Sequence, residues 1–122
     1  MRIFKNAWFR RFARRERITD RTLQEAIARA EEGVIDADLG GNIIKQRIAR
    51  PGQGKSGGYR TVIVFRKEDR AFFVYGYAKS ERDNIDQGEA DAFKRAAMEL
   101  LALSDEQIQV LIENGALTEV GS

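Results

Sequence analysis

Residues 59–79 read YRTVIVFRKEDRAFFVYGYAK, and this stretch decides the fold class. Residues 59–67 and 71–79 are two runs rich in β-branched and aromatic residues, and the polar tripeptide EDR separates them. This pattern is typical of two strands joined as a hairpin. Residues 42–49, NIIKQRIA, have the same character and predict a third strand. We therefore expect an antiparallel sheet at the centre of the chain.

Helices are expected on both sides of these strands. Residues 2–6, RIFKN, predict a short opening strand, after which Asn6 is the N-cap of a helix that ends near residue 15. Thr19 caps a second helix that ends near Gly33, and residues 36–42, DADLGGN, read as a turn-rich connection.

The C-terminal part predicts two more helices. Asp86 with Glu89, and Ser104 with Gln107, have capping-box spacing. Residues 116–120, ALTEV, follow as an edge strand or a tail. The expected fold is α+β: a small antiparallel β-sheet with two N-terminal helices and two C-terminal helices.

Length and composition indicate a single domain of residues 1–120 in a chain of 122, and Gly121-Ser122 is compatible with a cloning remnant. The chain contains no cysteine and no histidine, which excludes disulfides, thiolate sites and histidine-based acid/base catalysis and argues against zinc. No apolar run approaches the ~18 residues of a membrane span, and the N-terminus lacks the apolar stretch of a signal peptide. A cytoplasmic location is the expectation.

The net charge of +2 conceals an uneven distribution. Residues 1–21 contain eight Lys/Arg and two acids, residues 43–79 contain nine and two, and residues 80–122 contain three and ten. Such segregation favours a basic face for a nucleic-acid partner over an evenly solvated surface.

Residues 49–60, ARPGQGKSGGYR, contain the GKS ending of a phosphate-binding P-loop. That motif needs a glycine where this chain has Ala49, and a helix after it, whereas a strand follows here. Nucleotide hydrolysis is therefore disfavoured. The segment is better explained as a cationic loop around Lys55 that suits RNA phosphates. The alternative is that Lys55 is simply a solvated lysine.

The strands provide further cations. Alternation places Lys45 and Arg47 on one face of the first strand of this group, and Arg60 on a face with Val62 and Val64. Only the register decides whether Arg60 joins the other two.

These residue types suit phosphodiester cleavage. Arginine binds and neutralises phosphate through its planar fork, and a lysine acts as base or acid when burial and neighbouring cations lower its pKa. Lys45, Lys55 and Lys79 are the candidates, because RNA supplies its own 2′-hydroxyl nucleophile. The tyrosines at positions 59, 75 and 77 are either packing or base-stacking residues.

The segments GGNIIKQRIARPGQGKSGGYRTVIVF and RAFFVYGYAKSERDNI resemble the RelE/HigB branch of type II toxins in the RelE/ParE superfamily. The similarity is dense over residues 36–86 and looser elsewhere. It implies a small α+β endoribonuclease, an mRNA interferase that cleaves mRNA in the ribosomal A site and inhibits translation. It also implies a cognate antitoxin as partner.

The resemblance assigns roles by position. The family's basic strand residues fall on Lys45 and Arg47, its phosphate-contacting arginine on Arg60, its cationic loop on Lys55, and the segment after the last strand on Lys79, Glu81 and Arg82. We expect Lys55, Arg60, Lys45 and Lys79 to be catalytic without a metal or cofactor, and Arg47 and Arg82 to bind RNA. From their places in the sequence, rather than from the resemblance, Arg50, Tyr59, Arg10 and Arg14 are further RNA-binding candidates, the last two in contact with ribosomal RNA. The chain departs from RelE at Ser80, where RelE has an arginine, and at Asp86, where RelE has a catalytic tyrosine. HigB-like members lack that tyrosine, so the assignment of acid and base stays open.

Two other functions stay open on the residues. The same superfamily includes ParE-like toxins, which bind a topoisomerase and cleave no RNA. A non-catalytic RNA-binding domain would also account for the basic face. Neither membrane nor nucleotide is an expected partner.

Overall fold

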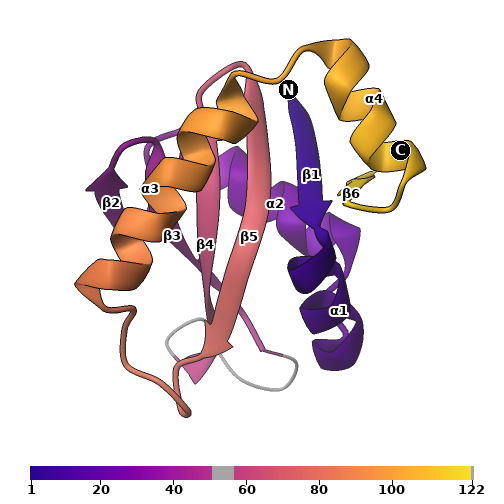
Figure 1. Cartoon of the computed structure of the whole chain (residues 1–122). Coiled ribbons are helices and arrows are strands. Elements are labelled where there is room, and N and C mark those ends of the chain that lie inside the picture. The colour runs from indigo at the N-terminus through magenta and orange to yellow at the C-terminus, as the bar shows by residue number, and fades with distance from the viewer. Residues whose placement is uncertain (51–56, 122) are drawn as a thin grey trace.

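The computed structural model describes residues 1–50 and 57–121, which form one mixed sheet with helices on both faces (Figure 1). In chain order the elements are β1 (Arg2–Asn6), α1 (Ala7–Glu16), α2 (Asp20–Glu31), β2 (Ala37–Gly40), β3 (Ile43–Ile48), β4 (Tyr59–Arg66), β5 (Arg70–Ala78), α3 (Gln87–Leu101), α4 (Asp105–Glu113) and β6 (Leu117–Glu119). Both predicted pairs of helices are present, and the order of strands in the sheet is β2-β3-β4-β5-β1-β6.

The prediction of a purely antiparallel sheet is wrong at β1. This strand pairs parallel to β5, with Phe4 opposite Phe72, and antiparallel to β6. Hairpins impose the antiparallel direction on β3, β4 and β5, but β1 reaches β5 only after two helices and three strands. Its direction is therefore set by where its apolar side chains are buried and not by a turn.

The prediction of a turn-rich connection over residues 36–42 also needs correction, because part of this segment forms strand β2. It pairs antiparallel with β3, and Gly40, Gly41 and Asn42 all have positive φ in the tight turn between them. Two glycines followed by asparagine suit a turn that needs this backbone conformation. The sheet consequently gains an edge strand beside β3.

The helix caps follow the sequence. The side chains of Asn6 and Thr19 accept the expected backbone hydrogen bonds at the starts of α1 and α2, and full capping boxes begin α3 and α4. None of the helices in the described part of the chain is long and apolar enough to cross a membrane.

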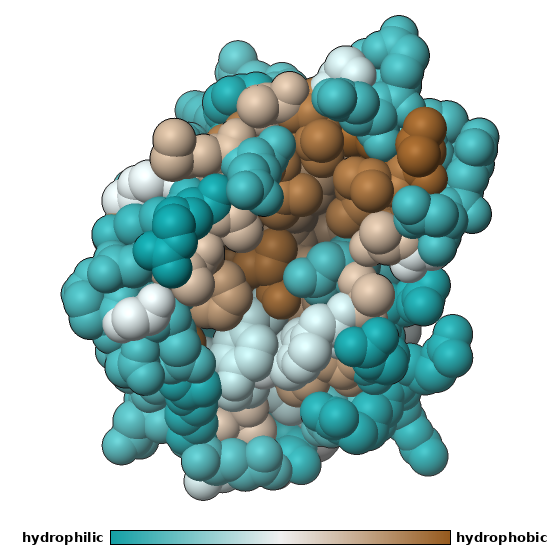
Figure 2. Space-filling model, in the orientation of Figure 1, coloured by the Kyte–Doolittle hydropathy of each residue, from teal (hydrophilic) through white to brown (hydrophobic). Residues whose placement is uncertain are grey.

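The two faces of the sheet carry separate cores. On one face, Phe9 of α1 and Leu23 of α2 share a cluster with Ile63 and Phe73 of the sheet, and all four side chains are almost fully buried. Helix α3 crosses the other face, and the apolar cluster there includes Phe72. Figure 2 shows apolar side chains gathered between α3 and α4, with more polar surface below them towards the start of α3.

Candidate functional site

Three strands bring charged and phenolic side chains together on the α3 face, at the end of the sheet beyond the start of α3. Arg47 on β3 lies opposite Arg60 on β4, and Arg60 lies opposite Tyr77 on β5. Lys45 occupies the same face two residues before Arg47. The register therefore unites the three cations that the sequence could only propose as neighbours.

Asp36 is the shared acidic partner of these cations. Its carboxylate lies 2.9 Å from Arg47 Nε, 3.5 Å from Arg60 Nε and 3.8 Å from Lys45 Nζ. The Arg60 side chain is 7% exposed and that of Asp36 is 12% exposed, so the group is largely withdrawn from water. Three positive charges around one negative charge give this group, which we call the Asp36 cluster, an excess of positive charge at the sheet surface.

Tyr77 completes the cluster with a buried phenol. The residue is 5% exposed, and its hydroxyl has no hydrogen-bond partner in the part of the chain that the structure describes. Burial raises the pKa of Tyr77, against the opposing influence of Arg60 and Arg82. At neutral pH the phenol therefore keeps its proton and can donate a hydrogen bond to an anion.

Arg82 connects the segment after β5 to the same face. Its guanidinium donates to Tyr75 Oη at 2.9 Å and to the Asn84 carbonyl at 2.8 Å, and it pairs with Glu89 on α3. The hydrogen bond from Arg82 is the main cause of the lowered pKa of Glu89. Lys45 Nζ in turn donates to Asn84 Oδ1 at 3.0 Å. Arg82 thus fixes the loop that borders the Asp36 cluster.

Other residues that the sequence predicted to be catalytic or RNA-binding lie outside the Asp36 cluster. Lys79 is exposed just after the end of β5, and Arg14 is exposed on α1 while Arg10 is half-buried there. Within the described residues, no side-chain hydrogen bond or ion pair involves these three. Lys55 lies outside the described residues, so its role stays a prediction from the sequence.

Tyr59 lies on the opposite face of the sheet, away from the Asp36 cluster. It is 2% exposed, its hydroxyl donates to Glu16 Oε1 at 2.8 Å, and Arg50 lies over its ring at 5.6 Å. The hydrogen bond from Tyr59 is the main cause of the lowered pKa of Glu16, which also accepts from Arg15. Tyr59 thus fastens the end of α1 to the sheet.

Sequence reasoning missed Asp36, which it assigned to a connecting turn, and gave Tyr77 no more than a packing or stacking role. The Gly-Gly-Asn turn was the available signal for Asp36, since a hairpin there brings residue 36 beside Lys45. Tyr77 could not be selected without the register. Across residues 1–50 and 57–121, no group of three or more acidic side chains is arranged to hold a metal ion.

Comparison with protein families matches residues 1–120 to the RelE toxin of the RelE/RelB toxin–antitoxin system. The chain belongs to the RelE toxin family. It is therefore a toxin of a toxin–antitoxin system, from a family that generally inhibits translation, and a cognate antitoxin is implied. Toxins of this family are generally ribonucleases. No curated protein and no solved structure matches the chain significantly.

Proposed function

We propose that this RelE-family toxin is an mRNA endoribonuclease that acts on the ribosome, and that the Asp36 cluster is its phosphate site. One observation carries the proposal. Arg47, Arg60 and Tyr77 lie side by side across three strands, with Lys45 next to them, on the face that also bears the excess of positive charge.

The arginines suit the charge that develops during cleavage. When the 2′-oxygen attacks phosphorus and the bond to the 5′-oxygen breaks, negative charge accumulates on the non-bridging phosphate oxygens. Arg60 is held by strand pairing and by Asp36, so its donors are oriented before RNA binds. Preorganised donors of this kind supply transition-state stabilisation. The protonated hydroxyl of Tyr77 adds a further donor on the same side.

Proton transfer falls to lysines in this scheme. Lys45 assists removal of the 2′-hydroxyl proton, and Lys55 is the alternative that the sequence provides. Lys79 or Arg82 orients the backbone or the leaving 5′-oxygen, which must gain a proton. The products are a 2′,3′-cyclic phosphate and a 5′-hydroxyl, and the reaction requires no metal ion.

Helix α1 is the part of the toxin that we propose to bind the ribosome. Arg10 and Arg14 are one helical turn apart on this helix, and their side chains have no acidic partner within the described residues. Cations placed in this way suit the backbone of ribosomal RNA. Loss of both should weaken ribosome binding and reduce its salt dependence.

The test is cleavage of a defined reporter mRNA by purified toxin, once in a translating extract and once as naked RNA. Primer extension locates the breaks, and a reporter with a single 2′-deoxy nucleotide at a mapped cleavage site serves as the matched substrate control. We expect discrete breaks within translated codons, only in the extract, and none at the 2′-deoxy position.

The other outcomes separate the alternative functions. Intact mRNA with arrested DNA supercoiling would identify a ParE-like topoisomerase poison. RNA binding without breaks would identify a non-catalytic module. Persistent cleavage at the 2′-deoxy position would exclude attack by the 2′-hydroxyl and overturn the mechanism.

A further inference from the structure

Asn84 lies in the segment between β5 and α3, where its side chain contacts Lys45 of the Asp36 cluster. Its Oδ1 accepts a hydrogen bond from Lys45 Nζ at 3.0 Å and another from the Ile85 backbone N–H at 2.9 Å. A backbone N–H is only a donor, so the atom that faces both partners must be the oxygen of the amide and not its nitrogen. The Asn84 side chain is thus oriented by its own backbone neighbour while it holds the Lys45 amine.

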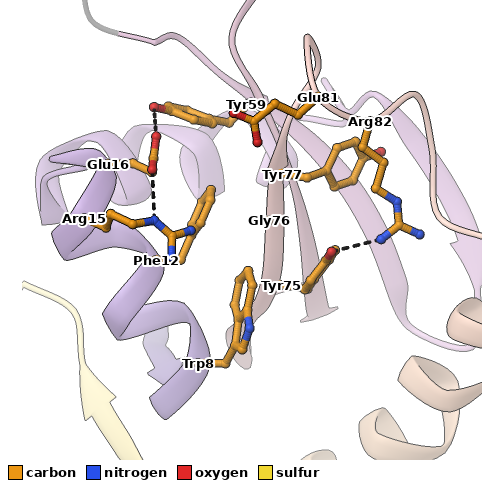
Figure 3. A pocket seen from close by; sticks show the side chains of 11 residues that line it. Trp8, Phe12, Arg15, Glu16, Tyr59, Tyr75, Gly76, Tyr77, Glu81 and Arg82 are labelled. Carbon is orange, nitrogen blue, oxygen red and sulfur yellow. Dashed lines mark hydrogen bonds and ion pairs between the residues drawn. The ribbon is translucent and has the colours of Figure 1, made fainter.

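Arg82 fixes the position of Asn84. Its Nε donates to the Asn84 carbonyl at 2.8 Å, and its two terminal nitrogens donate to Tyr75 Oη at 2.9 Å and to Glu89. The close-up in Figure 3 shows Arg82 with its hydrogen bond to Tyr75. Each nitrogen of the guanidinium therefore has a partner within the protein, and Arg82 ties Asn84 to β5 through Tyr75 and to α3 through Glu89.

Lys45 lies between this amide and a carboxylate that it shares with other cations. Its side chain is 12% exposed, and Asp36 is 3.8 Å from its Nζ, so the Asn84 oxygen at 3.0 Å is the closer of the two. Asp36 is in turn nearer to Arg47 and Arg60 than to Lys45. Neighbouring elements bring further titratable groups to this face: Arg82 with its partner Glu89, Lys94 on α3, and the phenols of Tyr75 and Tyr77.

An uncharged partner suits a lysine that must exchange a proton. A carboxylate at hydrogen-bond distance favours the charged form of an amine and so keeps it protonated. A neutral amide orients the same amine without adding a negative charge. A second carboxylate here would also reduce the excess of positive charge that attracts RNA phosphates. Asn84 therefore provides orientation and leaves the proton of Lys45 exchangeable.

We propose that Asn84 is a positioning residue that directs the Lys45 amine towards the 2′-hydroxyl of the RNA. This role rests on the proposed ribonuclease function, and it gives proton removal to Lys45 and not to the alternative, Lys55. The 2′-hydroxyl proton passes to the neutral amine of Lys45 while the 2′-oxygen bonds to phosphorus. The bond from phosphorus to the 5′-oxygen breaks, and that oxygen takes up a proton from water. Arg82 acts through Asn84 in this arrangement.

Asn84→Asp is the deciding variant, because it keeps the size of the side chain and the oxygen that accepts from Lys45 but adds a negative charge. Cleavage by full-length toxin is measured in single turnover on ribosomes programmed with the reporter mRNA, between about pH 6 and pH 9. The added carboxylate should keep Lys45 protonated, so we expect the pH of half-maximal rate to rise by about one unit. A role confined to folding would not move this midpoint.

Two further variants complete the set. Asn114, exposed at the C-cap of α4, also accepts a backbone N–H through Oδ1, so Asn114→Asp adds the same charge elsewhere and should leave the midpoint unchanged. Asn84→Ala removes the orienting oxygen. With folding verified by circular dichroism, its rate at saturating toxin should fall about tenfold or more, and the toxin concentration for half-saturation should change less than about twofold.

A second measurement needs no RNA. Trace acetic anhydride reacts with neutral amines, and mass spectrometry of the labelled full-length toxin compares Lys45 with Lys67, which is exposed between β4 and β5. Asn84→Asp should lower the ratio of Lys45 to Lys67 labelling about tenfold at neutral pH, because a shift of one unit changes the neutral fraction by that factor. An unchanged ratio would show that residue 84 does not control the Lys45 proton.

The outcomes separate this inference from the proposed function. Cleavage with the same pH midpoint in wild type and Asn84→Asp would overturn the role of Asn84 and leave the ribonuclease intact. An equal shift in Asn114→Asp would reduce the effect to net charge and also overturn it. Intact mRNA with wild-type toxin would overturn the ribonuclease and the role of Asn84 together.

Discussion

The two faces of strands β3, β4 and β5 are used in different ways. The face towards α1 and α2 is apolar along most of its length, with Ile44, Ile63 and Phe73 buried in one core. The face towards α3 is apolar where the helix packs on it, and beyond the start of the helix the strands carry Arg60 and Tyr77, which are both largely buried. The same strands thus provide stability on one face and a charged site on part of the other.

Truncation of a buried side chain on the face towards α1 and α2 should have the largest effect on the free energy of unfolding. Phe73→Ala removes a fully buried ring and is expected to lower the free energy of unfolding by about 3–5 kcal/mol. Urea denaturation followed by circular dichroism measures this. A loss below about 1 kcal/mol would show that this face is not the main core.

Tyr77→Phe should leave the stability of the fold almost unchanged but reduce mRNA cleavage. The change removes a buried hydroxyl that has no partner in the described chain, so the free energy of unfolding should change by less than about 1 kcal/mol. Cleavage in a translating extract should fall about 100-fold, the typical cost of losing one transition-state donor. Unchanged cleavage would remove Tyr77 from the proposed site.

Asp36→Asn tests the charge balance of the site. The substitution removes one negative charge from beside three cations, so uncleavable RNA should bind more tightly, and the slope of log affinity against log salt should steepen by about one. Cleavage should nevertheless slow, because Arg60 loses the partner that orients it. Filter binding at several salt concentrations measures the slope, and an unchanged slope would contradict the account.

Glu16→Gln should have the smallest effect on the free energy of unfolding, and this effect should depend on pH. The folded-state pKa of Glu16 is lowered chiefly by the hydrogen bond from Tyr59, so its contribution is present above its ordinary pKa of 4.5 and is lost as pH falls through the folded-state value. We expect a loss of about 1 kcal/mol at pH 7, which shrinks below pH 4.5. Glu25→Gln, in an exposed pair with Arg21, is the control, and a pH-independent difference would contradict the assignment.

Much of the fold follows from local patterns in the sequence. The hairpin of residues 59–79, the caps at Asn6 and Thr19 and both C-terminal capping boxes are predicted because each depends on neighbouring residues. The parallel pairing of β1 was not predictable in this way, since its partner lies about 70 positions along the chain.

The site was predictable as a set of residue types but not as an arrangement. Alternation places Lys45 with Arg47, yet only the register adds Arg60 and Tyr77 to them. The convergence of the cations on Asp36 depends on the β2–β3 turn, which brings Asp36 beside Lys45. Each of these is a long-range consequence of pairing, which local pattern does not encode.

The most direct test compares two arginines on one face of one strand. Arg60 lies at the start of β4 in the Asp36 cluster, whereas Arg66 lies at its end and pairs with Asp69. Each is changed to alanine, folding is verified by circular dichroism, and cleavage of reporter mRNA is quantified in a translating extract. We predict a loss of about 100-fold or more for Arg60→Ala and nearly full activity for Arg66→Ala. Equal activity of the two folded variants would contradict the proposal that RNA is cleaved at the Asp36 cluster.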